Sequence, residues 1–250
     1  MSVIQLQNIY KSYESTPVLK GIDLNVSAGQ IVGYIGPNGA GKSTLLNVII
    51  GKLAPSSGQV VFDGTSLTGR KPYQINQLGI ARVFQTPEIF ADLSVLHNVM
   101  IPALAKRDGA FKLNLLRSLD SETGIRQEAE HMLEDVGMLG RRDMAAGSLS
   151  RGDKRRMELA MCLIQHPRLL LLDEPTAGMS RHDTNTTIEL LKKIKSRGMT
   201  KVIIEHDMHV VFSLADKISV LAQGRIIADG TPDQVRGNPK VQEAYLGGTH

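Results

Sequence analysis

The sequence predicts an α/β fold built on a mostly parallel sheet, and three observations support that prediction. The glycine-rich segment Gly36–Thr44 joins an apolar run, Ile31–Ile35, to a run that favours a helix, Leu45–Ile50. Strand-like apolar runs alternate with helix-like segments in the second half of the chain. Residues 93–139 lack strand signals and carry Leu, Met and Ala at helical spacing. We therefore expect a sheet covered by helices, with a helical insertion in the chain.

The N-terminal segment predicts short antiparallel strands. Apolar and polar residues alternate there, as in strands that bury one face. The apolar positions are Val3, Ile4, Leu6, Ile9, Val18, Ile22, Leu24 and Val26. A further strand is expected at Gln59–Phe62, between two turn sequences.

The C-terminal half predicts strands that alternate with helices, which is typical of a parallel sheet. The expected strands are Leu169–Leu172, Lys201–Ile204 and Ile218–Leu221. The expected helices are Asp183–Lys195, Met208–Ala215 and Pro232–Arg236, the last after a hairpin arm at Gly224–Gly230.

The bulk composition is that of an ordinary soluble protein, with 42% hydrophobic residues, 22% charged residues and a net charge of +4. The chain has neither a leader-like start nor an apolar stretch of membrane-spanning length, so we expect a cytoplasmic protein. The one cysteine, Cys162, is expected to be a buried structural thiol. The basic stretch Lys154–Arg156 and the 4% aromatic content give little support to nucleic-acid binding.

The segment Gly36–Thr44 fits the pattern G-x-x-x-x-G-K-[ST], which predicts a nucleotide phosphate site. Its glycines allow a tight turn whose N–H groups point inward, and the following helix directs its free N–H groups at the same anion. Lys42 supplies a cation for the β- and γ-phosphates, and the Ser43 hydroxyl is a ligand for Mg²⁺. The expected phosphate-binding residues are Gly36, Pro37, Asn38, Gly39, Ala40, Gly41, Lys42, Ser43 and Thr44.

Two acids end the apolar run Leu169–Leu172. Asp173 at the strand tip can ligate a Mg²⁺ bound to phosphate, and Glu174 can deprotonate or orient the attacking water. By themselves they fit solvated acids at the end of a core strand equally well. The phosphate loop upstream favours the catalytic interpretation.

Two further polar residues follow apolar runs. His206 comes directly after Val202–Ile204, where its imidazole could donate to the γ-phosphate or hold the attacking water. Gln85 ends the run that starts at Val83, and it could reach Mg²⁺ or the water while marking a hinge. A lone His is more often structural or solvated, and a loop Gln is a weak signal.

Leu149–Asp153 opens a strongly helical run, Lys154–Gln165. Ser150 and Asp153 have the spacing of a capping box, so one interpretation is simply a helix start. The other is a second anion site, in which Ser150 and the N–H of Gly152 face a phosphate.

Together these motifs resemble the ATP-binding cassette (ABC) ATPases over nearly the whole chain. Gly36–Ser43 matches the Walker A motif, Leu169–Asp173 the Walker B strand and Glu174 the catalytic base. The resemblance implies a P-loop NTPase core, an antiparallel β subdomain and a helical subdomain. It implies one domain, with residues 1–90 and 165–250 in the core and about 91–160 in the helical subdomain.

The same resemblance assigns the remaining motifs. Gln85 matches the Q-loop, His206 the switch histidine and Tyr13 the aromatic residue that stacks on adenine. Leu149–Asp153 matches the family's signature, in which Ser150 and Gly152 contact the γ-phosphate. Arg151, Asp153 and Ser180 depart from the usual residues, and Ser180 puts one cross-dimer hydrogen bond in doubt.

Within the family, stretches such as DEPTAGMS and the ending VQEAYLGG resemble the branched-chain amino-acid importers, whose relatives transport urea and other amides. Such systems comprise two membrane-spanning permease subunits, two ATPase subunits in a head-to-tail dimer and a solute-binding protein. The resemblance therefore implies ATP and Mg²⁺ as cofactors. It also implies a place on the cytoplasmic face of the inner membrane, with ATP-driven dimer closure powering transport.

Three alternatives remain open from the sequence. The lipopolysaccharide-export ATPases share a similar ending. Chromosome-maintenance and DNA-repair ATPases share the motifs but carry long coiled coils, and no sustained heptads occur here. Translation-associated ATPases carry two cassettes in one chain, whereas this chain has a single one.

Overall fold

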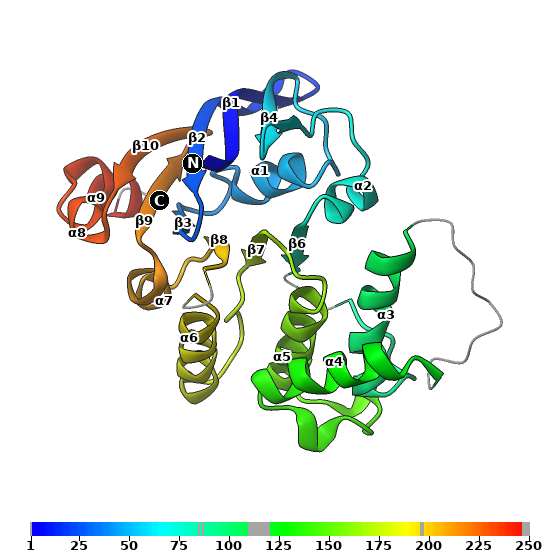
Figure 1. Cartoon of the computed structure of the whole chain (residues 1–250). Coiled ribbons are helices and arrows are strands. Elements are labelled where there is room, and N and C mark those ends of the chain that lie inside the picture. Colours follow the sequence, from blue (N-terminus) through cyan, green and yellow to red (C-terminus); the bar gives the residue numbers. More distant parts are fainter. Residues whose placement is uncertain (1, 85, 87, 110–120, 196–197, 247–250) are drawn as a thin grey trace.

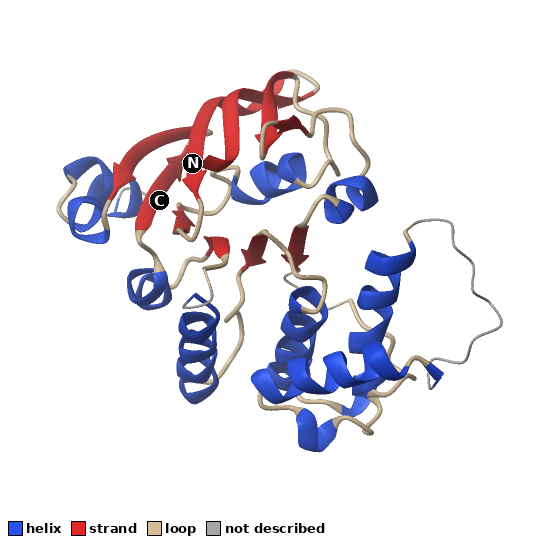
Figure 2. Ribbon diagram, viewed as in Figure 1, coloured by secondary structure: helices blue, strands red, loops and turns tan. Residues whose placement is uncertain are grey.

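The computed structural model describes residues 2–84, 86, 88–109, 121–195 and 198–246. Two sheets lie at one end of the molecule, and three helices, α3, α4 and α5, form a separate group at the other end (Figure 1). Figure 2 shows the same division by secondary structure, with the strands gathered on one side and this helical group beside them. The predicted α/β class is confirmed.

The smaller sheet is antiparallel, with the order β2-β1-β4-β5. Its strands are β1 (Ser2–Tyr13), β2 (Thr16–Ser27), β4 (Ser57–Phe62) and β5 (Thr65–Ser66). The expectation of short N-terminal strands was wrong, because β1 and β2 each run for 12 residues. Register shifts between them, near Ile9 for example, let the long hairpin bend without ending.

The larger sheet has six strands in the order β10-β9-β3-β8-β7-β6, with every neighbouring pair parallel except β9 and β10. The predicted mostly parallel sheet is therefore confirmed. The strands are β3 (Ile31–Ile35), β6 (Ile80–Val83), β7 (Leu169–Asp173), β8 (Thr200–Ile204), β9 (Lys217–Ala222) and β10 (Arg225–Gly230).

Helix α1 (Lys42–Ile49) shares one core with both sheets. Its buried Leu45 and Leu46 belong to the same cluster as Leu6 of the antiparallel sheet and Leu169 and Leu171 of β7. The intervening Leu170 and Leu172 belong to the other main cluster, as expected when successive strand residues point to opposite faces. Asp173 therefore follows Leu169 and Leu171 on the face toward α1.

The helical group consists of α3 (Val95–Asp108), α4 (Thr123–Asp135) and α5 (Arg151–Leu163), with short 3₁₀ turns at Leu139–Arg141 and Ala146–Ser148. Buried apolar residues of all three helices form one cluster, which continues onto the sheet face that carries Leu170 and Leu172. The helices expected from the Leu, Met and Ala spacing are thus present.

Four further helices follow the strands of the larger sheet or end the chain. They are α6 (Arg181–Lys195), α7 (Met208–Leu214), α8 (Pro232–Arg236) and α9 (Pro239–Leu246). Helix α2 (Pro72–Gln77) precedes β6. Among the described helices, none combines the length and apolar character that crossing a bilayer requires.

Candidate nucleotide site

The phosphate loop leaves β3 at Gly36 and enters α1 after Gly41. A Cβ at Gly36 would lie 2.0 Å from the carbonyl oxygen of Leu221, so only glycine lets the loop pass this close to β9. Gly41 has φ 106° and caps α1, a conformation that other residues rarely adopt. The N–H of Gly224 also donates to the carbonyl of Ala40 at 3.2 Å, so the β9–β10 turn supports the loop.

Lys42 is buried at the start of α1. Its Nζ donates to the carbonyl oxygens of Gly36 at 2.6 Å and of Pro37 at 3.1 Å, so the ammonium lies within the loop. Burial lowers the pKa of Lys42, and the charges of Glu174 and Asp173 oppose that shift. The opposing effect indicates that both carboxylates lie near the ammonium. Ser43 is exposed and Thr44 half-buried at the same helix start.

Asp173 ends β7 and is held by a neighbour. Its Oδ2 accepts from Nη2 of Arg82 in β6 at 2.6 Å, and Nη1 of the same guanidinium donates to Asn47 Oδ1 in α1 at 2.8 Å. Asp173 is buried, and the Arg82 side chain is only 9% exposed. Arg82 thus ties the last residue of β7 to the helix that follows the phosphate loop.

Glu174 has φ 46°, a left-handed conformation that costs a non-glycine residue about 1–3 kcal/mol. Its N–H donates to the carbonyl of Ile204 at 2.8 Å, which fixes the turn at the end of β7. The Oε1 of Glu174 lies 3.8 Å from Nδ1 of His206, and the imidazole is exposed. The structure therefore brings together two residues that the sequence places 32 positions apart.

Glu205 is fully buried beside this pair. Its Oε1 accepts from the N–H and from the Oγ1 hydroxyl of Thr176, at 3.0 and 2.6 Å, and Oε2 accepts from the N–H of His206 at 3.3 Å. Glu205 therefore joins the segment after Glu174 to the end of β8.

Tyr13 ends β1 and pairs with Thr16 across the hairpin turn. Two residues later, the carbonyl oxygen of Val18 lies only 3.2 Å from where a Cβ at Gly41 would be. The start of β2, just after the hairpin turn that follows Tyr13, therefore lies against the phosphate loop. Tyr13 is 46% exposed, and Lys11 Nζ lies over its ring at 5.6 Å from the centroid. Gln85 lies outside the described residues.

Ser150 caps α5, as the helix-start interpretation predicts. Its Oγ accepts from the N–H of Asp153 at 3.2 Å and donates to Asp153 Oδ2 at 2.8 Å. Asp153 is buried and pairs with Arg141 and with Arg156, the latter at 2.5 Å. Asp153, a departure from the usual signature, is thus part of a local ion-pair network. Gly152 lies in the first turn of α5, where N–H groups have no partner within the helix.

The other two departures also have local contacts. The Arg151 guanidinium lies against Gly178, where an added Cβ would come within 2.4 Å of Nη1. Ser180 Oγ accepts from the N–H of Asp183 at 3.2 Å and donates to Asp183 Oδ2 at 2.7 Å, so Ser180 supports the start of α6.

Sequence reasoning missed four residues of this region: Arg82, Arg155, Glu158 and Glu205. Arg82 interrupts an apolar strand, and Arg155 and Glu158 have the i, i+3 spacing of a helix pair. These residues stand out as part of the site only because their charged groups are buried, and the sequence alone does not show that burial. Cys162 is buried as expected, its burial raises the pKa of the thiol, and its Sγ donates to the carbonyl of Arg82 at 3.4 Å.

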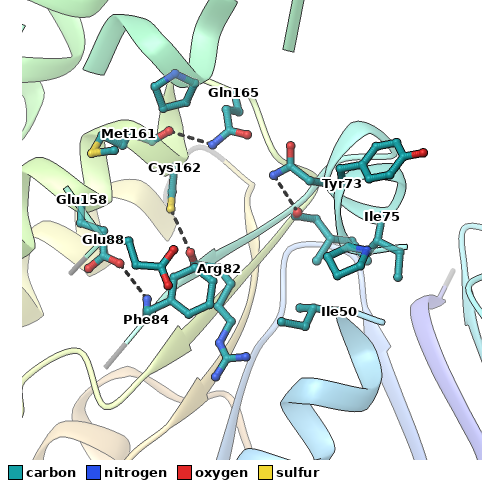
Figure 3. Close-up of a pocket in the computed structure, with 14 residues that line it drawn as sticks. Ile50, Tyr73, Ile75, Arg82, Phe84, Glu88, Glu158, Met161, Cys162 and Gln165 are labelled. Atoms are coloured by element: carbon teal, nitrogen blue, oxygen red, sulfur yellow. Dashed lines mark hydrogen bonds between the residues drawn. The ribbon is translucent and has the colours of Figure 1, made fainter. Parts of the chain in front are cut away.

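A cavity of about 400 Å³ lies between the helical group and the core (Figure 3). Apolar side chains of α2 and α5 line it, together with Ile50 just after α1 and with Phe84, Glu88 and Glu158. Nearby, Lys106 Nζ donates to the carbonyl of Gln77 at 2.6 Å, which ties α3 to α2 beside the cavity. The cavity is thus next to the end of β6 and apart from the phosphate loop.

Comparison with known proteins agrees with this geometry. Residues 19–177 match the protein family described as "ABC transporter", and residues 225–250 match "Branched-chain amino acid ATP-binding cassette transporter". The chain therefore belongs to the ATP-binding cassette ATPases of ABC transporters, which confirms the family expected from the motifs.

Individual relatives match along the full length. The branched-chain amino acid transport ATP-binding protein BraF of Pseudomonas aeruginosa is 34% identical, over 98% of each chain. The solved ADP conformation of an ABC transporter cassette has a TM-score of 0.87 at 31% identity and covers 99% of each chain. A dimeric cassette bound to ADP and Pi has a TM-score of 0.79 at 26% identity, covering 92% of this chain and 98% of that one.

Proposed function

We propose that this ATPase is the motor subunit of an importer for branched-chain amino acids or for related amino acids and amides. The main support for this proposal is the full-length match to a branched-chain amino acid transport protein. The site adds a phosphate loop together with Asp173 and Glu174. We place it on the cytoplasmic face of the inner membrane, bound to membrane-spanning permease subunits, with the solute-binding protein contacting those subunits.

The site's donors fit a nucleotide with Mg²⁺. Asp173 and Ser43 offer a carboxylate and a hydroxyl, which are the oxygen ligands that Mg²⁺ prefers, and Gln85 is the third proposed ligand. Bound Mg²⁺ would neutralise charge on the β- and γ-phosphates. The loop N–H groups and the N-terminus of α1 hold the phosphates, and Tyr13 stacks on the adenine.

The chemistry falls to three side chains. Lys42 carries its ammonium to the γ-phosphate from the carbonyls of Gly36 and Pro37 that now accept from it. Glu174 accepts the proton of the attacking water as that water adds to phosphorus and the bond to ADP breaks. His206, 3.8 Å from Glu174, orients the water and donates to the γ-phosphate.

We infer that two copies, or this chain and a paralogous subunit, form a head-to-tail dimer around two ATP molecules. The related cassette solved as a dimer with ADP and Pi supports this arrangement. Ser150 and Gly152 lie at the N-terminus of α5, and this helix start binds the γ-phosphate of the ATP held by the partner subunit. In that dimer residues 91–160 act as the helical subdomain and move against the core as the interface closes.

The 400 Å³ cavity fits the permease contact. Its lining is mostly apolar, with Tyr73 47% exposed at its edge and Glu88 as an acidic group (Figure 3). We propose that a short cytoplasmic helix of a permease subunit inserts there with an apolar side chain.

Uptake by the assembled transporter tests the proposal. The chain is purified with its permease subunits and solute-binding protein and placed in liposomes, and uptake of labelled leucine, isoleucine, valine and an amide is measured with ATP inside. We expect ATP-dependent uptake of at least one of them. ATP hydrolysis without uptake of any amino acid or amide would contradict the importer assignment, and DNA- or ribosome-stimulated hydrolysis would favour another class.

A further inference from the structure

Helix α5 carries a buried ion pair one turn after the signature residues. Arg155 Nη1 donates to Glu158 Oε2 at 2.9 Å, and the two side chains are only 7% and 5% exposed. Such a pair is costly to bury unless its remaining donors and acceptors are satisfied. Four further hydrogen bonds join this pair to the backbone of described residues at the ends of β6 and β7.

One of these segments is the end of β6. Glu158 Oε1 accepts from the N–H of Phe84 at 2.8 Å (Figure 3), and Arg155 Nη1 donates to the carbonyl oxygen of Phe84. Both polar backbone groups of Phe84 are thus held by one side-chain pair. Phe84 directly precedes Gln85, the proposed Mg²⁺ ligand.

The other segment is the end of β7. Arg155 Nη2 donates to the carbonyl oxygens of Glu174, at 3.0 Å, and of Asp173, at 3.4 Å. These residues are the proposed base and metal ligand. The Arg155 guanidinium therefore binds the backbone carbonyls of Phe84, Asp173 and Glu174. It ties them to α5, whose first turn holds the signature residues.

Glu158 and Phe84 also line the cavity between the helical group and the core. A segment that enters this cavity touches the same pair that holds Glu174. A buried pair within one helix would stabilise α5 alone, whereas this one also binds the backbone at the C-terminal ends of β6 and β7.

We infer that Arg155 and Glu158 are positioning residues that transmit movement at the cavity to Glu174 and so set the rate of hydrolysis. The inference rests on the proposed function of the site. When the Phe84 backbone shifts, Arg155 must shift with it, and the carbonyls of Asp173 and Glu174 follow. A displacement of about 1 Å of a reacting group can cost roughly 100-fold in rate.

Arg155→Lys and Glu158→Gln test this inference in the purified full-length chain. Lysine cannot reproduce the planar fork that holds several carbonyls. Glutamine keeps an acceptor for Phe84 but loses the charge opposite Arg155. Arg126→Lys with Glu130→Gln is the matched control, since that Arg–Glu pair on α4 is partly exposed at 3.5 Å.

We expect kcat for ATP to fall roughly 10- to 100-fold in either variant, with KM and the affinity for a fluorescent ATP analogue within twofold of wild type. The double variant should lose little more than one single variant, because both residues act as a unit. The α4 control should keep wild-type kcat.

Two results would overturn the inference. One is a folded Arg155→Lys or Glu158→Gln protein with wild-type kcat. The other is a loss of nucleotide affinity that equals the loss of kcat. An inactive wild-type chain would instead contradict the proposed function, so the two failures are distinguishable. Circular dichroism of each variant identifies any protein that has failed to fold.

Discussion

Arg82 and Asp173 form an ion pair between neighbouring strands, with Nη2 2.6 Å from Oδ2 and both side chains less than a tenth exposed. The same guanidinium reaches Asn47 in α1. The carboxylate proposed as metal ligand therefore has a countercharge within the protein. Removing that countercharge should therefore make the stability of the protein depend more strongly on bound Mg²⁺.

Replacement of Arg82 by Met should destabilise the nucleotide-free protein by about 3–5 kcal/mol, because it removes the ion-pair partner of the buried Asp173 carboxylate. Mg²⁺ with ATP should restore much of that loss, since the metal supplies the missing countercharge. We expect a larger rise in melting temperature with Mg²⁺-ATP in the variant than in wild type, measured by calorimetry. Asn47→Ala, which keeps the ion pair, is the control. Equal rises in Arg82→Met and wild type would contradict the assignment of Asp173.

Lys42→Met should separate stability from function. Burial lowers the pKa of Lys42 in the folded state, so the unfolded chain binds more protons between the folded and unfolded pKa values. The buried charge therefore costs stability below the folded pKa, and that cost is relieved as pH rises toward the unfolded value. At pH 7 the variant should melt at or above the wild-type temperature without nucleotide, yet lose ATPase activity. A variant with wild-type turnover would contradict the site.

Glu174→Gln should bind ATP normally and hydrolyse it at least 100-fold more slowly, because the amide cannot accept the proton of the attacking water. With ATP and Mg²⁺ we expect it to accumulate as a dimer in size-exclusion chromatography. Glu189→Gln on the exposed face of α6 is the control and should remain active. Turnover of Glu174→Gln at the wild-type rate would exclude Glu174 as the base.

Ser150→Ala tests the role of the signature beyond helix capping. Ser150 caps α5 by accepting a hydrogen bond from the N–H of Asp153 at 3.2 Å. Ser94 caps α3 in the same way, accepting from the N–H of His97 at 3.1 Å. Loss of either cap should cost about 1 kcal/mol of stability. Of the two variants, Ser150→Ala alone should also reduce ATP-driven dimer formation in light scattering, because we propose that the Ser150 hydroxyl contacts the partner's nucleotide and assign no such role to Ser94. A dimer as stable as that of Ser94→Ala would leave Ser150 with a capping role alone.

Much of the fold could be predicted because its elements have strong local patterns. The apolar run Leu169–Leu172 predicts β7 within one residue, and the α8 bounds match exactly the predicted Pro232–Arg236. Helices α2 and α9 were not predicted, because Pro72–Gln77 has only six residues, one of them buried, and only two residues separate α9 from α8.

The residues of the candidate site that could be predicted are those that belong to a motif with fixed spacing along the chain. The phosphate loop needs one continuous segment, so its glycines and Lys42 could be found by spacing. The contacts of Arg82, Arg155 and Glu205 join residues from different strands and helices, and their significance depends on burial, which only the three-dimensional structure shows.

The phosphate loop depends on residues that are synthesised about 180 positions after it. Strand β3 lies between β8 and β9, and the loop after it rests on Leu221 and Gly224 of the β9–β10 hairpin. A ribosome that has made only the first two hundred residues has therefore produced every glycine of the loop but none of this support. The nascent chain can therefore hold the loop against these contacts only after β9 and the turn into β10 have been synthesised.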